Sequence, residues 1–166
     1  MSTDFDSIAN ILKKAFQVEV DGFTFYSMAA ERADKPAVQQ LFERLARDET
    51  EHQAYIKAVM RRYEDHGASS FSFDRRDPDL GEFSSEIFTE SFKEQAQGEI
   101  LETGAVSIGI QLELNAVEFF GSAAKEASDP QVKGFYRFLA DWEGSHLRML
   151  EKLYDSIRVD PWPEKD

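Results

Sequence analysis

Apolar residues recur at steps of three and four along four long segments of the chain. This spacing collects them on one face of an α-helix, and it predicts helices over about residues 8–33, 36–66, 102–127 and 130–157. The apolar faces of the second and fourth segments repeat about every 3.5 residues, which is typical of helices packed nearly parallel or antiparallel in a bundle. Four long helices with such faces predict an all-α fold.

The starts of three of these helices carry recognisable signals. Asp6 or Ser7 is the expected N-cap of the first helix. Pro36 and Pro130 suit a first helical turn and open the second and fourth helices. Only a few residues separate each proline from the preceding helix, and such short joints make each pair of helices an antiparallel hairpin.

The connection between the two hairpins is much longer and covers about residues 67–98. Its first part is rich in turn-forming and charged residues, and a short helix is expected over residues 84–97. A connection of this length can run along the bundle and let the second hairpin enter from the other end. We therefore predict one domain over residues 1–166, an antiparallel four-helix bundle with a long crossover between the second and third helices.

Acidic residues and histidines interrupt the apolar faces at matching places in the two halves, which cover about residues 8–66 and 102–157. Each of these polar residues in the first half has a counterpart of the same type 94 residues later. The pairs are Glu19 and Glu113, Glu49 and Glu143, and His52 and His146. Because Pro36 and Pro130 keep the same offset, duplication of a helical hairpin is the simplest explanation. The resulting two-fold pseudo-axis would bring both sets together at the centre of the bundle.

These residue types at these spacings favour a pair of metal ions. Helix positions three apart share a face, so the glutamate and histidine of each Glu-x-x-His motif can converge on one ion. One such motif is weak evidence, but six polar residues replacing core residues in register would be very costly to bury without cations. Four carboxylates balance the charge of two divalent ions. Mixed oxygen and imidazole ligands suit iron, manganese or zinc, with ferrous iron as the first choice.

Composition excludes several other classes of function. The net charge of −13 disfavours nucleic acid and anionic membrane surfaces as partners. The chain has no cysteine, which excludes thiolate zinc sites, iron–sulfur clusters and a thiol nucleophile. No apolar run is long enough to span a membrane, and the first residues have no signal-peptide pattern. A cytoplasmic location is the expectation.

On this ligand pattern the chain resembles the rubrerythrin and ferritin-like di-iron carboxylate proteins, whose bundles carry a glutamate on each of two helices and a Glu-x-x-His on each of the other two. The resemblance extends over about residues 8–157. The stretches that carry it are residues 19–26 (EVDGFTFY), 48–52 (DETEH), 113–120 (ELNAVEFF) and 142–146 (WEGSH). The resemblance implies a ferritin-like fold and a homodimer.

The resemblance also implies a role for each candidate residue. Glu19 and Glu113 would be terminal ligands, one for each ion. Glu49 and Glu143 would bridge the two ions, and His52 and His146 would each complete one coordination sphere. The implied function is an oxidoreductase that reduces hydrogen peroxide or dioxygen while each iron cycles between +2 and +3.

The chain departs from rubrerythrin itself in two respects that leave alternatives open. Without cysteines it cannot form the rubredoxin domain that supplies electrons, so a separate electron-donor protein is expected. Rubrerythrin has an additional glutamate three residues from the third-helix ligand, whereas Ile110 and Ala116 flank Glu113 here. The six-residue set is closer to that of bacterioferritin. A ferroxidase that handles iron and a non-catalytic metal-binding bundle are therefore the alternative functions.

Tyr26 is a further candidate, seven residues after Glu19 on the same face of the first helix. It is expected either to donate a hydrogen bond to a ligand carboxylate, with a catalytic role from outside the ligand set, or to be an ordinary core tyrosine. Its counterpart in the repeat is Phe120, so any such role is asymmetric. Trp142 is expected to pack near the site. Asp48 is expected either to orient a histidine or, as the preferred interpretation, to be a solvated helix residue.

Overall fold

Four long α-helices make up almost all of the part of the chain that the computed structural model describes, which is residues 4–66, 71–73 and 100–157. The helices are α1 (Asp4–Arg32), α2 (Pro36–His66), α5 (Ile100–Glu126) and α6 (Pro130–Ile157). The starts of α2 and α6 are the predicted ones. The expected N-cap at Asp6 or Ser7 is wrong, because α1 already includes both residues.

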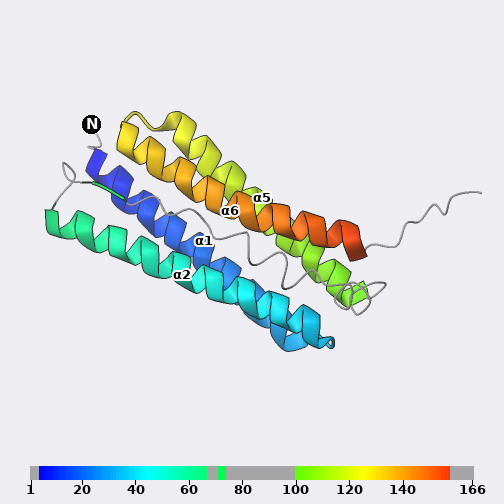
Figure 1. Cartoon of the computed structure of the whole chain (residues 1–166). Helices are drawn as coiled ribbons and strands as arrows, with labels where there is room; N and C mark the ends of the chain where they lie inside the picture. The colour runs from blue at the N-terminus through cyan, green and yellow to red at the C-terminus, as the bar shows by residue number, and fades with distance from the viewer. Residues whose placement is uncertain (1–3, 67–70, 74–99, 158–166) are drawn as a thin grey trace, which may run out of the picture.

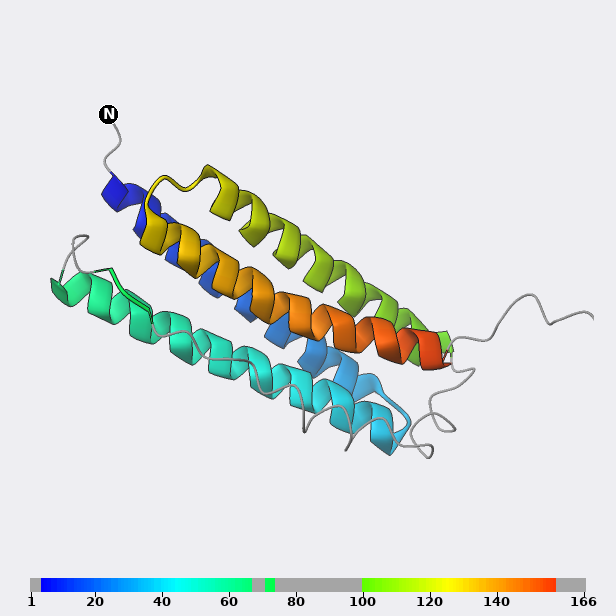
Figure 2. The same cartoon turned by 45° about the horizontal axis from the view of Figure 1, so that its top comes forward.

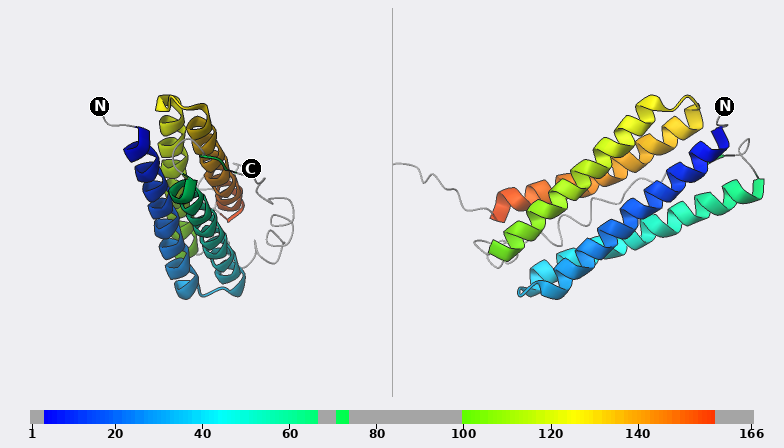
Figure 3. Two further views of the ribbon diagram at one scale, coloured as in Figure 1. Left: turned by 90° about the vertical axis from the view of Figure 1, so that its left-hand side faces the viewer. Right: turned by 180° about the vertical axis from the view of Figure 1, so that it is seen from behind.

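The helices form two antiparallel hairpins that pack side by side (Figure 1). Within the hairpins, α1 packs mainly against α2, and α5 against α6. The turned view in Figure 2 shows all four helices following nearly the same axis, and Figure 3 shows them from one end and from behind. No strand occurs in the described residues. This arrangement confirms the predicted all-α, ferritin-like four-helix bundle.

The direction of the helices explains the long connection between the hairpins. The end of α2 and the start of α5 lie at opposite ends of the bundle (Figure 1), so α2 and α5 run in the same direction. The helix expected over residues 84–97 lies outside the described residues. A short described stretch after α2 contacts the bundle, where the ring of Phe71 packs edge-on against Phe135 with centroids 5.6 Å apart.

The joint between α5 and α6 shows why α6 begins where it does. The side chain of Asp129 accepts hydrogen bonds from the backbone N–H groups of Gln131, at 2.7 Å, and Val132, at 3.1 Å. Asp129 is therefore the N-cap of α6, and it satisfies donors that have no partner inside the helix. Pro130 follows in the first turn, where its missing N–H costs nothing.

Two clusters of buried apolar side chains form the core, one towards each end of the bundle. One includes Leu12, Ile56, Phe120, Phe135 and Leu139. The other includes Tyr26, Leu41, Leu45, Val106 and Leu150. Burial of each large apolar side chain stabilises the fold by about 1.5–3 kcal/mol.

Residues that are counterparts in the internal repeat lie in opposite clusters. Leu45 lies in one cluster and its counterpart Leu139 in the other, and Tyr26 and Phe120 are divided in the same way. A two-fold pseudo-axis therefore passes between the clusters. The polar residues that interrupt the helix faces lie at this level, so the fold brings the two halves of the candidate site together.

Candidate metal centre

All six predicted ligands are buried in the middle of the bundle, each with at most 7% of its surface exposed. They come from all four helices. α1 contributes Glu19, α2 contributes Glu49 and His52, α5 contributes Glu113, and α6 contributes Glu143 and His146. Burial of four carboxylates together is very unfavourable unless cations or protons neutralise them.

The potential ligand atoms divide into two groups that share two residues. Glu19 and His52 group with Glu49 and Glu143, and the chosen ligand atoms all lie within 4.8 Å of one another. The second group has the same geometry and consists of Glu49, Glu113, Glu143 and His146. Glu49 and Glu143 thus face both groups. The resemblance implies that Glu49 and Glu143 are the shared ligands, and the division into two groups agrees with it.

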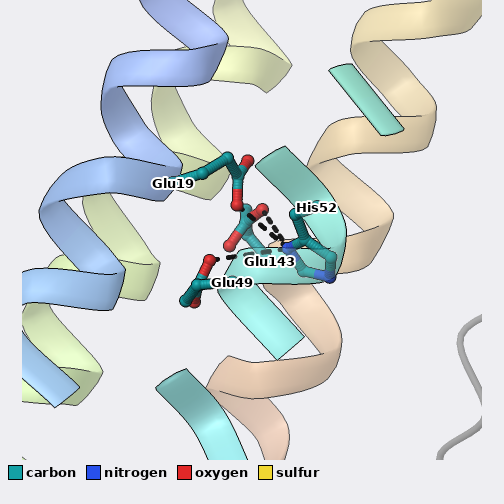
Figure 4. A group of neighbouring side chains, drawn as sticks. All are labelled: Glu19, Glu49, His52 and Glu143. Carbon is teal, nitrogen blue, oxygen red and sulfur yellow. Dashed lines mark hydrogen bonds and ion pairs between the residues drawn. The ribbon is translucent and has the colours of Figure 1, made fainter. Parts of the chain in front are cut away.

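The first group shows how the side chains converge (Figure 4). Nδ1 of His52 lies 2.9 Å from Oε2 of Glu19, 3.5 Å from Oε2 of Glu49 and 3.8 Å from Oε1 of Glu143. Three carboxylates thus approach one ring nitrogen. Three carboxylate oxygens and one imidazole nitrogen directed at a common centre form a donor set that suits iron, manganese or zinc.

Buried polar atoms without hydrogen-bond partners provide an independent test of this fit. Oε1 of Glu19, Oε1 of Glu143 and Nδ1 of His146 are all buried and make no hydrogen bond. A buried polar atom without a partner costs about 1–3 kcal/mol. Each of these atoms belongs to a predicted ligand, so divalent cations would satisfy all three. The residues present therefore fit the pair of ions that the family resemblance implies.

Electrostatics in the metal-free cluster favour bound protons at two of the carboxyls. Burial raises the pKa of Glu19 well above its ordinary value, and the negative charge of Glu49 raises it further. Burial likewise raises the pKa of Glu143, and the charge of Glu19 is the next cause. For Glu49, burial alone would raise the pKa, but the nearby rings of His146 and His52 outweigh burial and lower it.

His146 is also affected by its carboxylate neighbours. Burial would lower the pKa of His146, but contacts with Asp48, Glu113 and Glu49 raise it well above its ordinary value. Its Nδ1 lies 3.3 Å from Oε1 of Glu49 and 3.5 Å from Oε1 of Glu113. Metal binding would have to displace the protons that these residues hold, so binding at this site depends on pH.

Tyr26 lies beside the site, and its hydroxyl donates a short hydrogen bond to Oε1 of Glu113. This contact crosses from the first hairpin to the second and confirms the expected hydrogen bond to a candidate ligand carboxylate. Burial raises the pKa of Tyr26, and the charge of Glu113 is the next cause. The tyrosine therefore keeps its proton. Phe120, its counterpart in the repeat, has no hydroxyl to offer Glu19.

Two residues next to the histidines have a larger part in the site than the sequence indicated. The indole of Trp142 stacks on the ring of His52, with centroids 4.0 Å apart and an interplanar angle of 10°. Oδ2 of Asp48, which was expected either to orient a histidine or to be solvated, lies 3.7 Å from Nε2 of His146. The sequence repeat could have indicated that both residues lie near the site, because positions 48 and 142 directly precede the two shared glutamates. The docking of the hairpins determines which histidine each one contacts.

A cavity of about 270 Å³ reaches the cluster between α1 and α5. Its lining includes Glu49, Glu113 and Glu143, together with Gly22 of α1. A Cβ atom at Gly22 would lie 3.0 Å from Cδ of Glu49, which is tighter than most real Cβ contacts, so the Glu49 side chain would have to shift. Helix periodicity alone allows either Phe23 or Gly22 at this inner position of α1. The structure places Gly22 there, while Phe23 is 40% exposed.

Comparison with known proteins gives one positive result. The family model described as Rubrerythrin matches residues 10–154, a range that contains all six predicted ligands. Searches of curated proteins and of solved structures found no match. Among the described residues, no helix is long and apolar enough to cross a membrane.

Proposed function

The chain belongs to the rubrerythrin family, and from this membership we propose that it is a di-iron oxidoreductase that reduces hydrogen peroxide or dioxygen. One observation supports the proposal most strongly. Two groups of buried glutamate and histidine ligand atoms share Glu49 and Glu143, as two neighbouring ions with bridging carboxylates require. Such a pair can deliver two electrons to one oxidant.

In the proposed site each residue has a defined role. Glu19 and His52 would hold one ion, and Glu113 and His146 would hold the other. Glu49 and Glu143 would be ligands common to both. Iron is the proposed metal, with manganese or zinc as ions that the same donors accept. The charges of four carboxylates and two divalent ions cancel, which removes most of the cost of burying either set alone.

Two bound ferrous ions would supply the two electrons that, with two protons, convert one hydrogen peroxide molecule to two waters. The protein positions and shields this chemistry. The cavity beside Gly22 admits a molecule as small as a peroxide, and the apolar clusters on either side restrict bulk water. The Tyr26 hydroxyl fixes the orientation of the Glu113 carboxylate and holds a proton beside it. We propose that a separate donor protein returns the electrons.

The function is tested by mixing anaerobic protein loaded with ferrous iron with hydrogen peroxide. We expect one peroxide to be consumed for every two irons oxidised, at a rate well above that of free ferrous iron under the same conditions. Rapid-mixing absorbance follows the ferric product, and a peroxide assay gives the stoichiometry. Oxidation no faster than that of free iron would refute the proposed function.

Gly22→Ala should slow this reaction without unfolding the protein. The added methyl group would press on the Glu49 carboxylate and narrow the cavity, and we expect the rate of iron oxidation to fall about tenfold. Gly104→Ala is a matched control, because a Cβ atom there meets nothing within 4 Å. It should leave the rate unchanged and raise stability by about 1 kcal/mol. Equal rates in both variants would show that Gly22 has no role at the site.

A ferroxidase that handles iron is the second candidate function, and Ala116 is the observation that favours it. Ala116 lines the cavity beside Glu113, at one of the two positions three residues from Glu113 where an additional glutamate would lie. The site therefore has no seventh carboxylate at this position. The size of the assembly separates the two functions. A hollow shell of many chains that accumulates ferric mineral would favour the ferroxidase.

A homodimer is the proposed assembly of the oxidoreductase. The large apolar side chains that remain exposed in the described residues all lie on α1 and α5. They are Phe23, Met28, Ile108, Leu114 and Phe119. Exposed apolar side chains that are confined to two helices favour a contact surface on those helices. A solution mass of twice the 19.0 kDa chain would agree with a dimer that buries this face, and a mass equal to one chain would contradict it.

A further inference from the structure

The two halves of the site differ at positions that the internal repeat makes equivalent. Position 48 precedes the first shared glutamate and position 142 precedes the second, but the residues are Asp48 and Trp142. Each reaches across the bundle to the histidine of the other hairpin. Asp48 contacts His146, and Trp142 contacts His52. The same step of the repeat therefore places a carboxylate beside one histidine and an indole face beside the other.

Asp48 gives His146 a polar partner on the ring edge that faces away from the other ligands. Its Oδ2 atom lies 3.7 Å from Nε2, while Nδ1 of the same ring faces Glu49 and Glu113. Arg44 fixes the aspartate through a 3.0 Å hydrogen bond. A carboxylate at the outer nitrogen of a metal-binding histidine fixes the tautomer and the ring orientation and makes the ligand more basic.

Trp142 gives His52 a different environment. Its indole is nearly parallel to the imidazole, and Tyr55 and Phe138 pack around it with ring centroids 5.1 Å and 4.7 Å from the indole. This stack restricts the ring plane, but an indole face accepts no ordinary hydrogen bond. Nε2 of His52 has no hydrogen-bond partner within the described part of the chain.

A second difference acts on the same side of the site. Tyr26 donates a hydrogen bond to Glu113, whereas the equivalent residue for Glu19 is Phe120, which has no donor. Hydrogen bonds to ligating carboxylates orient them for the ion, as acceptors do for ligating histidines. Both polar supports thus serve the half formed by Glu113 and His146. The half formed by Glu19 and His52 has neither.

We infer that the site consists of two unequal metal sites, in which Glu113 and His146 hold the tighter ion and Glu19 and His52 hold the weaker, exchangeable one. Asp48 and Tyr26 are the positioning residues that create the difference. The ions therefore bind in a fixed order. This inference rests on the proposed function only in requiring that the six residues hold two ions.

A crystal grown with one Co²⁺ ion per chain tests the order of binding. Cobaltous ion is a suitable probe because it takes the same oxygen and imidazole ligands as ferrous iron. Anomalous scattering at the cobalt edge should place the ion beside Glu113 and His146. Equal occupancy of both positions, or preference for the Glu19 and His52 half, would overturn the inference. Absence of cobalt from both would instead contradict the proposed function.

Titration of Asp48→Asn with Co²⁺, followed by visible absorption and calorimetry, tests the cause. We expect the tighter binding step to weaken by about 10–100-fold, with a change of less than about threefold in the weaker step. Asp65→Asn removes the same charge from an exposed position on α2 and should bind as the wild type does. If Asp48→Asn weakens both steps equally, or neither, Asp48 does not create the difference.

Discussion

Glu49→Ala should deprive the protein of its second metal ion and reduce the rate of its reaction with peroxide by at least about 100-fold. This loss is larger than is typical when a residue that only contacts a metal ligand is removed. Glu49 belongs to both ligand groups, and its two oxygens lie 3.5 Å from Nδ1 of His52 and 3.3 Å from Nδ1 of His146. Within the described parts of the chain, Glu143 is the one other residue that belongs to both groups. Metal content after iron loading, together with the rapid-mixing rate, measures the effect.

Glu51→Ala is the matched control for this variant. Glu51 lies two residues away on α2 and is exposed, so its removal changes the charge of the same helix without touching the site. It should bind two ions and react at the wild-type rate. Retention of two tightly bound ions by Glu49→Ala would show that this carboxylate is not a shared ligand.

The stability of the protein should depend on pH in opposite ways with and without metal. Glu19 and Glu143 have pKa values above the ordinary 4.5, chiefly because they are buried, and His146 has a pKa above 6.5. For groups of this kind the folded state binds protons more tightly than the unfolded state. Their stabilising effect is complete below the unfolded pKa and is lost as pH rises through the folded pKa. Metal-free protein should therefore lose stability between about pH 5 and pH 8.

Glu49 does not reverse this trend. Its pKa is lowered, because the nearby histidine rings outweigh the effect of burial, so its contribution changes only below its ordinary value of 4.5. Metal acts in the other direction, since ions compete better as protons leave. An ion at 100 times its dissociation constant adds about 2.7 kcal/mol, or roughly 5–10 °C in melting temperature. The gain on adding Mn²⁺ or anaerobic Fe²⁺ should be larger at pH 8 than at pH 5.5.

Glu143→Gln separates this effect from general acid sensitivity. Glutamine resembles the protonated acid, so the metal-free variant should have a weaker pH dependence and should gain little from metal. Glu151→Gln, at an exposed position on the same helix, should behave as the wild type. Thermal melts at pH 5.5 and pH 8, with metal and with chelator, give the comparison. A metal-free wild type that becomes more stable towards pH 8 would contradict the expected electrostatics.

The repeat in the sequence was sufficient to predict the bundle and the six buried residues. The apolar spacing and the two prolines fixed the starts of α2 and α6, and the 94-residue offset of Glu19, Glu49 and His52 indicated which polar residues meet. These features depend on helix periodicity and short joints, which are local. The start of α1 was less predictable, because Asp6 and Ser7 are favourable N-cap residues that instead lie inside the helix.

The surroundings of the site could not be predicted because they depend on how the hairpins dock. Periodicity allowed either Gly22 or Phe23 on the inner face, and only the approach of α2 requires the residue without a side chain. The contact between Asp48 and His146 likewise crosses from one hairpin to the other. A sequence shows that Asp48 and Trp142 occupy equivalent positions, but the ring that each contacts is a matter of packing.

Anomalous diffraction at the iron edge, from a crystal of anaerobically reduced and iron-replete protein, tests the di-iron site most directly. We expect two iron peaks, each beside both Glu49 and Glu143, one also contacting Glu19 and His52 and the other Glu113 and His146. The same data identify the metal and the number of ions. A single peak, or no peak between Glu49 and Glu143, would contradict a di-iron centre.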